Sequence, residues 1–161
     1  MITTYIGIDP GLSGAIAIID EESGFISAYD MPVIKNKGQD TLMIQSIINE
    51  HSVVNKTFCI IEASKPATGN QGGYGRGIST FLINYGKLVA VLEILQIPFK
   101  EVHPLTWKKY YSLIKQEKIA SIKLAKKLFP KIQYRTERGR WLDGRAESLL
   151  LAEYGRRLGN V

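Results

Sequence analysis

The sequence predicts a mixed α/β layer protein whose strands come mainly first and whose chain closes on helices. Three observations predict this class: short β-branched apolar runs, an apolar segment with helical spacing between two of them, and basic amphipathic stretches toward the C-terminus. The chain has 161 residues, of which 45% are hydrophobic and 22% charged. This size and composition suit one globular core, so we expect a single domain over residues 1–161.

The first three strands are expected to form a meander. Residues 3–9 (TTYIGID) are apolar and β-branched, and the run stops at Asp9-Pro10-Gly11. Proline and glycine end regular structure, so this strand should run into a tight turn. Residues 15–20 (AIAIID) and 25–30 (FISAYD) follow at short spacing and predict two further strands joined by a hairpin turn.

A helix and a fourth strand should follow the meander. Residues 39–51 place their apolar side chains near helical spacing, and residues 57–63 (TFCIIEA) are rich in β-formers. The order is therefore β-β-β-α-β. The stretch from Ser64 to Gly77 contains five glycines, so we do not expect a regular element there.

The rest of the chain predicts one more strand among helices. The apolar run after the glycine-rich stretch indicates a buried helix, and His103-Pro104 should open a helical stretch through Trp107. The expected elements are a buried helix over 81–95, a strand over 97–102, and helices over 103–107, 118–129 and 142–158.

The sequence carries no sign of export or membrane insertion. No apolar run approaches the roughly 18 residues of a membrane span, and the N-terminus lacks the pattern of a secretory signal. We therefore expect no membrane association and a cytosolic protein. Cys59 is the only cysteine and lies in an apolar run, which excludes a disulfide framework or a cysteine zinc site and predicts a core position.

The net charge of +6 is concentrated in one half of the chain. Residues 1–99 hold 6 Lys/Arg against 9 Asp/Glu, a net charge of −3, whereas residues 100–161 hold 15 against 6, a net charge of +9. Basic helices are often only a solvated surface. A charge this lopsided favours contact with a polyanion, and nucleic acid is the first candidate.

Four carboxylates occupy positions where an isolated charge is unfavourable. Asp9 and Glu62 each end an apolar strand, where an ionised side chain needs a partner or a metal. Asp143 and Glu147 are four residues apart, so both project from one face of the last helix. Like charges so placed repel each other unless a cation lies between them.

The donor set of these acids suits a hard cation. Oxygen ligands without a matching His or Cys set favour Mg²⁺ or Mn²⁺, and two such ions can support phosphodiester hydrolysis. Each acid also has an ordinary structural explanation. Asp143 could be a charge favoured by the helix dipole, Glu147 could pair with Lys or Arg, and Asp9 could cap the turn before Pro10.

The ordered motifs resemble the RuvC-like Holliday-junction resolvases. The resemblance covers nearly the whole chain and is closest to the branch of phages, some bacteria and plant organelles. It implies an RNase H-like fold with a mixed five-stranded sheet flanked by helices, a homodimer, and paired symmetric nicking of four-way DNA junctions with Mg²⁺ or Mn²⁺, two ions per active site. The motifs are IGIDPGLSGAIAIID, FCIIEAS, GNQGGYGRG, VHPLTWKK and DGRAESLLLAEYGRR.

The resemblance assigns the catalytic and metal-binding roles to the same four acids, Asp9, Glu62, Asp143 and Glu147. Better-known bacterial members space the two helical acids three apart, where this chain has Ala146. Both spacings lie on one helical face, so the metal site is compatible with either. Members close to this branch often carry His where this chain has Leu142, so a ligand role for that His is absent.

A lysine and a set of DNA contacts complete the expected site. Lys118 matches a family lysine near the scissile phosphate and should stabilise developing charge. Without the resemblance, it could equally be an ordinary lysine at the start of a helix. Tyr74 is the candidate for stacking on an unpaired base, and the alternative is an incidental Tyr in a disordered loop tip. Trp107, His51 and His103 are expected to be structural. The expected DNA-binding residues are Lys65, Tyr74, Arg76, Lys108, Lys109, Lys123, Lys127 and Arg140, and Lys126, Arg135 and Arg138 are candidates by charge alone.

Other functions remain open at this point. A nuclease of the same fold could act instead on flaps, replication forks or RNA–DNA hybrids. The motif DPGLSGAIAIID also resembles the first phosphate loop of actin-like sugar kinases, although those need two such domains around a nucleotide. A junction-binding protein without catalysis is the third possibility. The expected location is the cytoplasm of a bacterial or phage-infected cell, or an organellar nucleoid.

Overall fold

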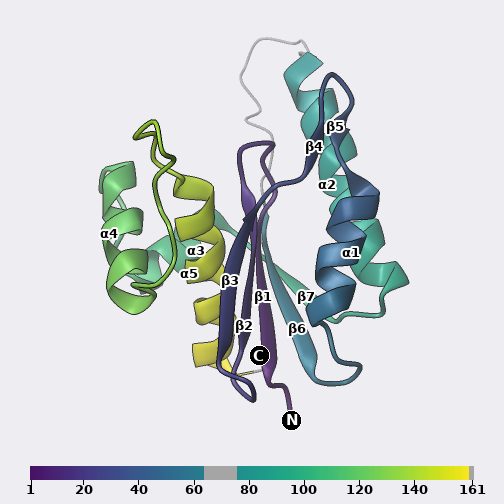
Figure 1. The fold of residues 1–161 in the computed structure, drawn as a ribbon, viewed down its shortest axis with the longest axis horizontal. Coiled ribbons are helices and arrows are strands. Elements are labelled where there is room, and N and C mark those ends of the chain that lie inside the picture. Colours follow the sequence, from purple (N-terminus) through teal and green to yellow (C-terminus); the bar gives the residue numbers. More distant parts are fainter. Residues whose placement is uncertain (64–75, 160–161) are drawn as a thin grey trace.

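A mixed five-stranded sheet forms the middle layer of the protein, with helices on both faces (Figure 1). The computed structural model describes residues 1–63 and 76–159. The spatial order of the strands is β3-β2-β1-β6-β7. Their bounds are β1 Thr4–Asp9, β2 Ala15–Asp20, β3 Phe25–Asp30, β6 Thr57–Glu62 and β7 Phe99–Val102.

The strand directions place two carboxyl ends side by side. β1 and β2 pair antiparallel, as do β2 and β3, which is the predicted meander. β6 pairs parallel with β1, with Ile8 opposite Ile61, and β7 continues in the same direction. Asp9 and Glu62 are the next residues of their strands, so they end neighbouring parallel strands at one edge of the sheet.

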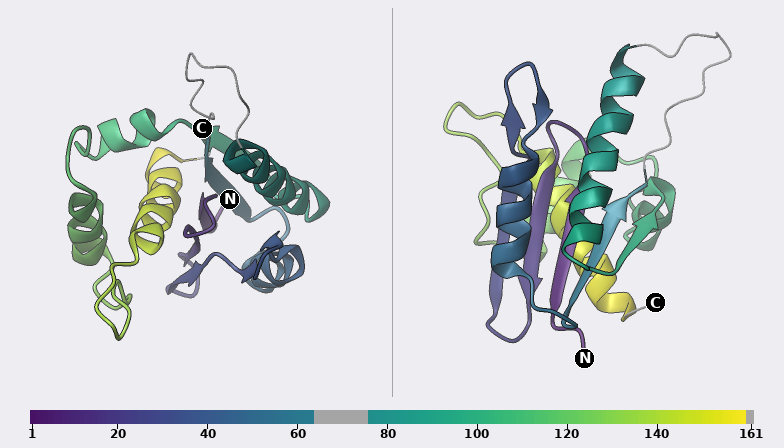
Figure 2. Two further views of the ribbon diagram at one scale, coloured as in Figure 1. Left: turned by 90° about the horizontal axis from the view of Figure 1, so that it is seen from above. Right: turned by 90° about the vertical axis from the view of Figure 1, so that its right-hand side faces the viewer.

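The helices divide between the two faces of the sheet (Figure 2). α1 (Thr41–His51) and α2 (Arg76–Ile94) cover one face. α5 (Asp143–Leu158) lies on the other, with α4 (Lys118–Leu128) packed on its outer side and α3 (Pro104–Tyr110) beside it. None of the described helices has the length and apolar character that crossing a membrane requires.

Side chains alternate between the two faces along each strand, so each face of the sheet has its own hydrophobic cluster. Ile6 and Ile8 point toward α1 and α2, where they pack with Ile44 and Leu88. Residues of the opposite parity and of α5 form the second cluster, which includes Tyr5, Ala17, Ile60, Trp107 and Leu149. Cys59 is fully buried, as predicted.

The predicted strands are confirmed within a residue or two, and so are the helix boundaries beyond α2, except that α3 ends at Tyr110, three residues later than predicted. The α1 helix begins after Asp40, whose side chain accepts a hydrogen bond from the Met43 N–H at 3.1 Å and so caps it. α3 begins after His103, whose ring accepts from the Leu105 N–H at 3.3 Å. His103 thus has a structural contact of the kind that was predicted, and it also lies close enough to Glu62 to lower the pKa of that carboxyl.

Two predictions about the middle of the chain need correction. The helix predicted from residue 81 begins at Arg76, so the last two residues of the glycine-rich stretch belong to a regular element. It is also buried along one side only: Leu88 and Leu92 are fully covered, whereas Ile83 is 62% exposed. Apolar composition alone does not reveal which side of a helix meets the core.

A small hairpin was not predicted. β4 (Val33–Ile34) and β5 (Gly38–Gln39) pair antiparallel outside the main sheet. Two-residue strands have no repeating pattern that a sequence could display. The hairpin is held in place by Gln39, whose Nε2 donates to the Pro10 carbonyl at 2.8 Å and whose backbone N–H donates to Asn84 Oδ1 at 3.1 Å.

Candidate active site

Close packing of α5 on β1 brings the helical acids to the end of the first strand. A Cβ atom at Gly7 would lie 2.0 Å from the Ser148 carbonyl oxygen, so only glycine lets the helix backbone rest directly on the strand. A Cβ atom at Gly144 would lie 2.6 Å from the Ser13 carbonyl oxygen. The first turn of α5 therefore abuts the turn that follows Asp9.

Asp9 is the carboxylate on which the other acids act most clearly. It is partly buried, and its Oδ1 accepts a weak hydrogen bond from the Gly11 N–H at 3.3 Å. Burial, together with the charges of Glu147, Glu62 and Asp143, raises the pKa of Asp9 to about 7. The four predicted acids thus share one electrostatic environment.

Glu62 is held by a residue that the sequence suggested only as core. Trp107 is fully buried, and its Nε1 donates to Glu62 Oε2 at 2.8 Å. Burial raises the pKa of Glu62, while the Trp107 hydrogen bond and the charge of Lys108 act in the opposite direction. Trp107 therefore packs in the core, as predicted, and also orients a carboxylate of the candidate site.

The two helical acids are each paired with a lysine. Lys108 Nζ lies 3.2 Å from Glu147 Oε1, and Lys118 Nζ lies 3.3 Å from Asp143 Oδ2. The Lys118 side chain is 86% exposed, so this pair is screened by water and the lysine is free to move. Glu147 therefore forms the ion pair that was its ordinary structural explanation. It also lies near Glu62, a buried carboxylate whose negative charge repels it.

The site offers oxygen donors, but the described side chains are not arranged around a common point. Among residues 1–63 and 76–159, no group of three or more His, Cys, Asp or Glu side chains is disposed to hold a metal ion. Because all four acids are carboxylates and their repulsion raises the pKa of Asp9, the donor chemistry fits a hard divalent cation.

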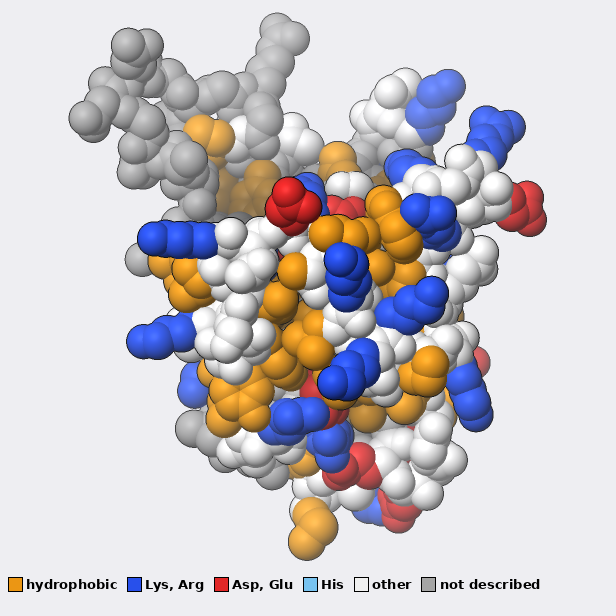
Figure 3. Space-filling model, turned by 90° about the vertical axis from the view of Figure 1, so that its left-hand side faces the viewer, with side chains coloured by type: hydrophobic (Ala, Val, Ile, Leu, Met, Phe, Trp, Pro, Cys, Tyr) orange, Lys and Arg blue, Asp and Glu red, His pale blue; other side chains and the backbone are white. Residues whose placement is uncertain are grey.

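Basic side chains gather on the face formed by α4 and the segment that follows it (Figure 3). Residues 118–140 contain eight Lys/Arg and one acidic residue, Glu137. The predicted contacts Lys109, Lys118, Lys123, Lys127 and Arg140 are all exposed. Lys108 differs, because it is half-buried against Glu147. Lys65, Tyr74 and the side chain of Arg76 lie outside the described residues.

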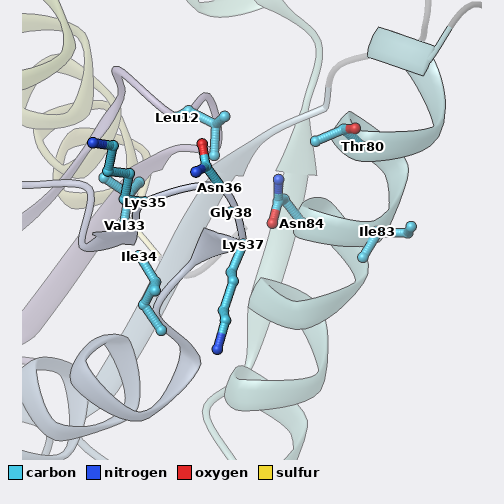
Figure 4. Close-up of a pocket in the computed structure, with 10 residues that line it drawn as sticks. All are labelled: Leu12, Val33, Ile34, Lys35, Asn36, Lys37, Gly38, Thr80, Ile83 and Asn84. Carbon is cyan, nitrogen blue, oxygen red and sulfur yellow. The ribbon is translucent and has the colours of Figure 1, made fainter.

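Three further features near the acids had no signal in the sequence. Arg145 donates two hydrogen bonds to Asp30, at 2.7 and 3.0 Å, and so ties the first turns of α5 to the end of β3. The exposed Trp141 stands just before α5. The β4–β5 hairpin and α2 enclose a groove of about 490 Å³, with Lys35, Lys37 and Asn84 around it (Figure 4).

Two solved structures resemble the protein along almost its entire length. A Thermus thermophilus RuvC structure has a TM-score of 0.62 and 13% identity, and the match covers 97% of this chain and 96% of that chain. The protein has a RuvC-like fold. A structure of T. thermophilus RuvC in complex with a Holliday junction substrate has a TM-score of 0.60 and 10% identity, covering 98% of this chain and 96% of that chain.

The RuvC-like fold agrees with the predicted RNase H-like class, including the mixed five-stranded sheet with helices on both faces. No protein-family profile matches the chain, and no curated protein matches its sequence. At 10 and 13% identity the likeness concerns the fold alone. The chemistry must therefore be argued from the residues of the site.

Proposed function

We propose that this protein is a metal-dependent endonuclease that resolves four-way DNA junctions by paired symmetric nicks. The observation that carries the proposal is that Glu62, Asp143 and Glu147 all lie close enough to Asp9 to raise its pKa, beside a strongly basic face. The fold is the one seen in T. thermophilus RuvC, which has been solved with a Holliday junction substrate. Phosphodiester hydrolysis uses both features, because carboxylates can hold the metal ions and a basic surface can bind the phosphates of the DNA.

The four carboxylates are proposed to hold Mg²⁺, with Mn²⁺ as a substitute and two ions per site. Bound there, the ions would supply an activated water and neutralise charge on the leaving oxygen. The protein's own contribution is to place and orient the acids. Among the described residues, the Gly11 N–H is the hydrogen-bond donor to Asp9, and Glu62 is oriented by Trp107. In the metal-free protein, Lys108 pairs with Glu147 and Lys118 pairs with Asp143.

Lys118 has a second role in this proposal. It lies beside Asp143 with a side chain that is 86% exposed, so its ammonium group can move to a phosphate without loss of packing. There it would stabilise negative charge that develops on the scissile phosphate. The DNA backbone would follow the basic face through Lys109, Lys123, Lys127 and Arg140, with Lys65, Tyr74 and Arg76 as further proposed contacts.

Paired nicks need two active sites, so we propose a homodimer. The outer side of α2 offers the contact: Leu82, Ile83 and Ile94 are 46, 62 and 71% exposed. Burying such side chains stabilises association by roughly 25 cal/mol per Å² of apolar surface. Sedimentation analysis of wild-type protein and of Ile83→Asp tests this contact, and an unchanged dimer in the variant would place the interface elsewhere.

Other branched DNA is the second candidate substrate. The basic face recognises phosphates, and phosphates alone do not distinguish a four-way junction from a flap, a fork or an RNA–DNA hybrid. The same acids would cut all of them. A junction-binding protein without catalysis and an actin-like nucleotide-binding domain receive no support from any specific contact.

A cleavage assay on matched substrates tests the proposal. A synthetic four-way junction, a flap and an RNA–DNA hybrid that share sequences are incubated with protein in Mg²⁺ or in EDTA. We expect Mg²⁺-dependent nicking of the junction in preference to the others, and binding without nicking by Asp9→Asn. An intact junction beside a cut flap or hybrid would reject resolution in favour of the second candidate. Equal cleavage by Asp9→Asn would remove Asp9 from the site.

A further inference from the structure

Trp141 is an exposed aromatic residue between the basic face and the acids. The chain has two tryptophans. Trp107 is fully buried, whereas Trp141 is 39% exposed. A single exposed aromatic residue is ordinary in itself. Trp141 differs from such residues because it lies two residues before Asp143 and because of the side chains around it.

One face of the Trp141 ring is covered by a cation. The guanidinium carbon of Arg135 lies 3.7 Å from the ring centroid. The same two residues form a backbone bridge, and the Leu142 N–H donates to the Tyr134 carbonyl at 2.9 Å. The Tyr134 hydroxyl donates to the Ala125 carbonyl at 3.0 Å, at the end of α4. The ring is thus fixed on a hairpin-like loop anchored to a helix, and little conformational freedom remains to be lost on binding.

Two hollows border the ring. Their volumes are about 500 and 530 Å³, and both are lined by Lys118, Arg140, Trp141 and Asp143. The first extends to Leu12, in the turn that follows Asp9. An aromatic ring, two cations and a path toward the acids therefore lie in one continuous surface region.

We propose that Trp141 is a stacking platform for an unpaired nucleobase of the bound DNA strand. The base would lie on indole surface that Arg135 leaves uncovered, while Lys118 and Arg140 hold the adjoining phosphates. This inference rests on the proposed function and specifies how its site grips the strand. A platform of one ring does not read sequence, because every base has a π-face. It would set the position of the strand relative to the acids.

Tryptophan emission gives a direct test, because only Trp141 is accessible of the two. The protein is kept in EDTA, so that binding is followed without cleavage. The probe is a single-stranded oligonucleotide of about 12 nucleotides, and its counterpart has the same phosphates with abasic sugars. We expect the oligonucleotide to quench the Trp141 emission of the wild-type protein, which is the part of the emission that is missing in Trp141→Phe. The abasic strand should bind without quenching it. Equal quenching by both strands, or none by either at saturation, would overturn the platform.

Affinity measurements on variants complete the test. Trp141→Ala should weaken binding of the oligonucleotide roughly 5- to 100-fold, with a smaller effect for Trp141→Phe and for the abasic strand. Phe25→Ala is the matched control, because Phe25 is also 39% exposed, stacks on His51 and starts β3 at the end opposite Asp30. Folded Trp141→Ala protein that binds within twofold of wild type would mean that the Arg135–Trp141 stack only holds the loop.

The outcomes separate this inference from the proposed function. Base-dependent quenching without junction cleavage in Mg²⁺ would keep the platform and reject the resolvase. Cleavage without base-dependent quenching would keep the resolvase and reject the platform.

Discussion

Replacing Asp9 with Asn should stabilise the metal-free protein, by an amount that depends on pH. The pKa of Asp9 is about 7 in the folded protein and 3.8 when unperturbed, because burial and the neighbouring acids oppose its charge. Its contribution to stability is fully present below pH 3.8 and is lost as the pH rises to about 7. Asn has a similar shape and keeps an acceptor for the Gly11 N–H, yet it never ionises.

The expected magnitude follows from the two pKa values. Between pH 4 and pH 7 the folded protein holds one more proton than the unfolded chain, so wild type loses about 1.4 kcal/mol per pH unit relative to Asp9→Asn. The difference should level off near 4 kcal/mol above pH 7. Mg²⁺ should make wild type the more stable of the two proteins at high pH, because a cation among the acids stabilises ionised Asp9. The variant lacks this charge and should bind the cation more weakly.

Urea unfolding in EDTA at several pH values between 5 and 8.5 measures this difference. Asp20→Asn is the control of opposite sign, since Asp20 also ends a strand but Ser23 lowers the pKa of its carboxyl through a 2.6 Å hydrogen bond. That variant should be less stable than wild type by an amount that does not change over this pH range, because Asp20 is already ionised in both the folded and the unfolded protein above pH 5. A difference for Asp9→Asn that stays flat and below about 1 kcal/mol would refute the argument that the acids repel one another at this position.

Three further substitutions, one of them with a matched control, probe the packing and chemistry of the site. Gly7→Ala should lower the free energy of unfolding by about 3 kcal/mol, because the new Cβ would meet the backbone of α5. Gly86→Ala is the control, since a Cβ there meets nothing within 4 Å, and it should raise the free energy of unfolding by up to about 1 kcal/mol. Urea unfolding measures both differences. Trp107→Phe removes the hydrogen bond to Glu62 and should weaken Mn²⁺ binding, measured by calorimetry, about tenfold; unchanged affinity would deny Trp107 a positioning role. Lys118→Ala should slow junction cleavage about 100-fold with unaltered unfolding, and an unaltered rate would leave Lys118 as a surface lysine.

The strands and the position of the acids were predictable because both depend on short-range rules. Runs of β-branched residues identify β1, β2 and β6, and a carboxylate that ends such a run lies at the edge of the sheet. The parallel pairing of β1 with β6 then places Asp9 beside Glu62. The i, i+4 spacing of Asp143 and Glu147 fixes their common face before any fold is known.

The contacts around the acids were not predictable, because they depend on packing between distant elements. Trp107 donates to Glu62 across 45 residues, and Arg145 reaches Asp30 across 115. The extent of α2 and its exposed side were misjudged for the same reason. The β4–β5 hairpin is defined by Gln39 contacts to Pro10 and Asn84, none of which a local pattern encodes.

Diffraction from crystals grown with Mn²⁺, recorded at the manganese absorption edge, tests the central claim most directly. We predict anomalous density between Asp9, Glu62 and Glu147, with Asp143 within reach and Lys108 turned away from Glu147. Density elsewhere on the molecule, or none among these carboxylates at saturating Mn²⁺, would contradict the assignment of the four acids as a metal site.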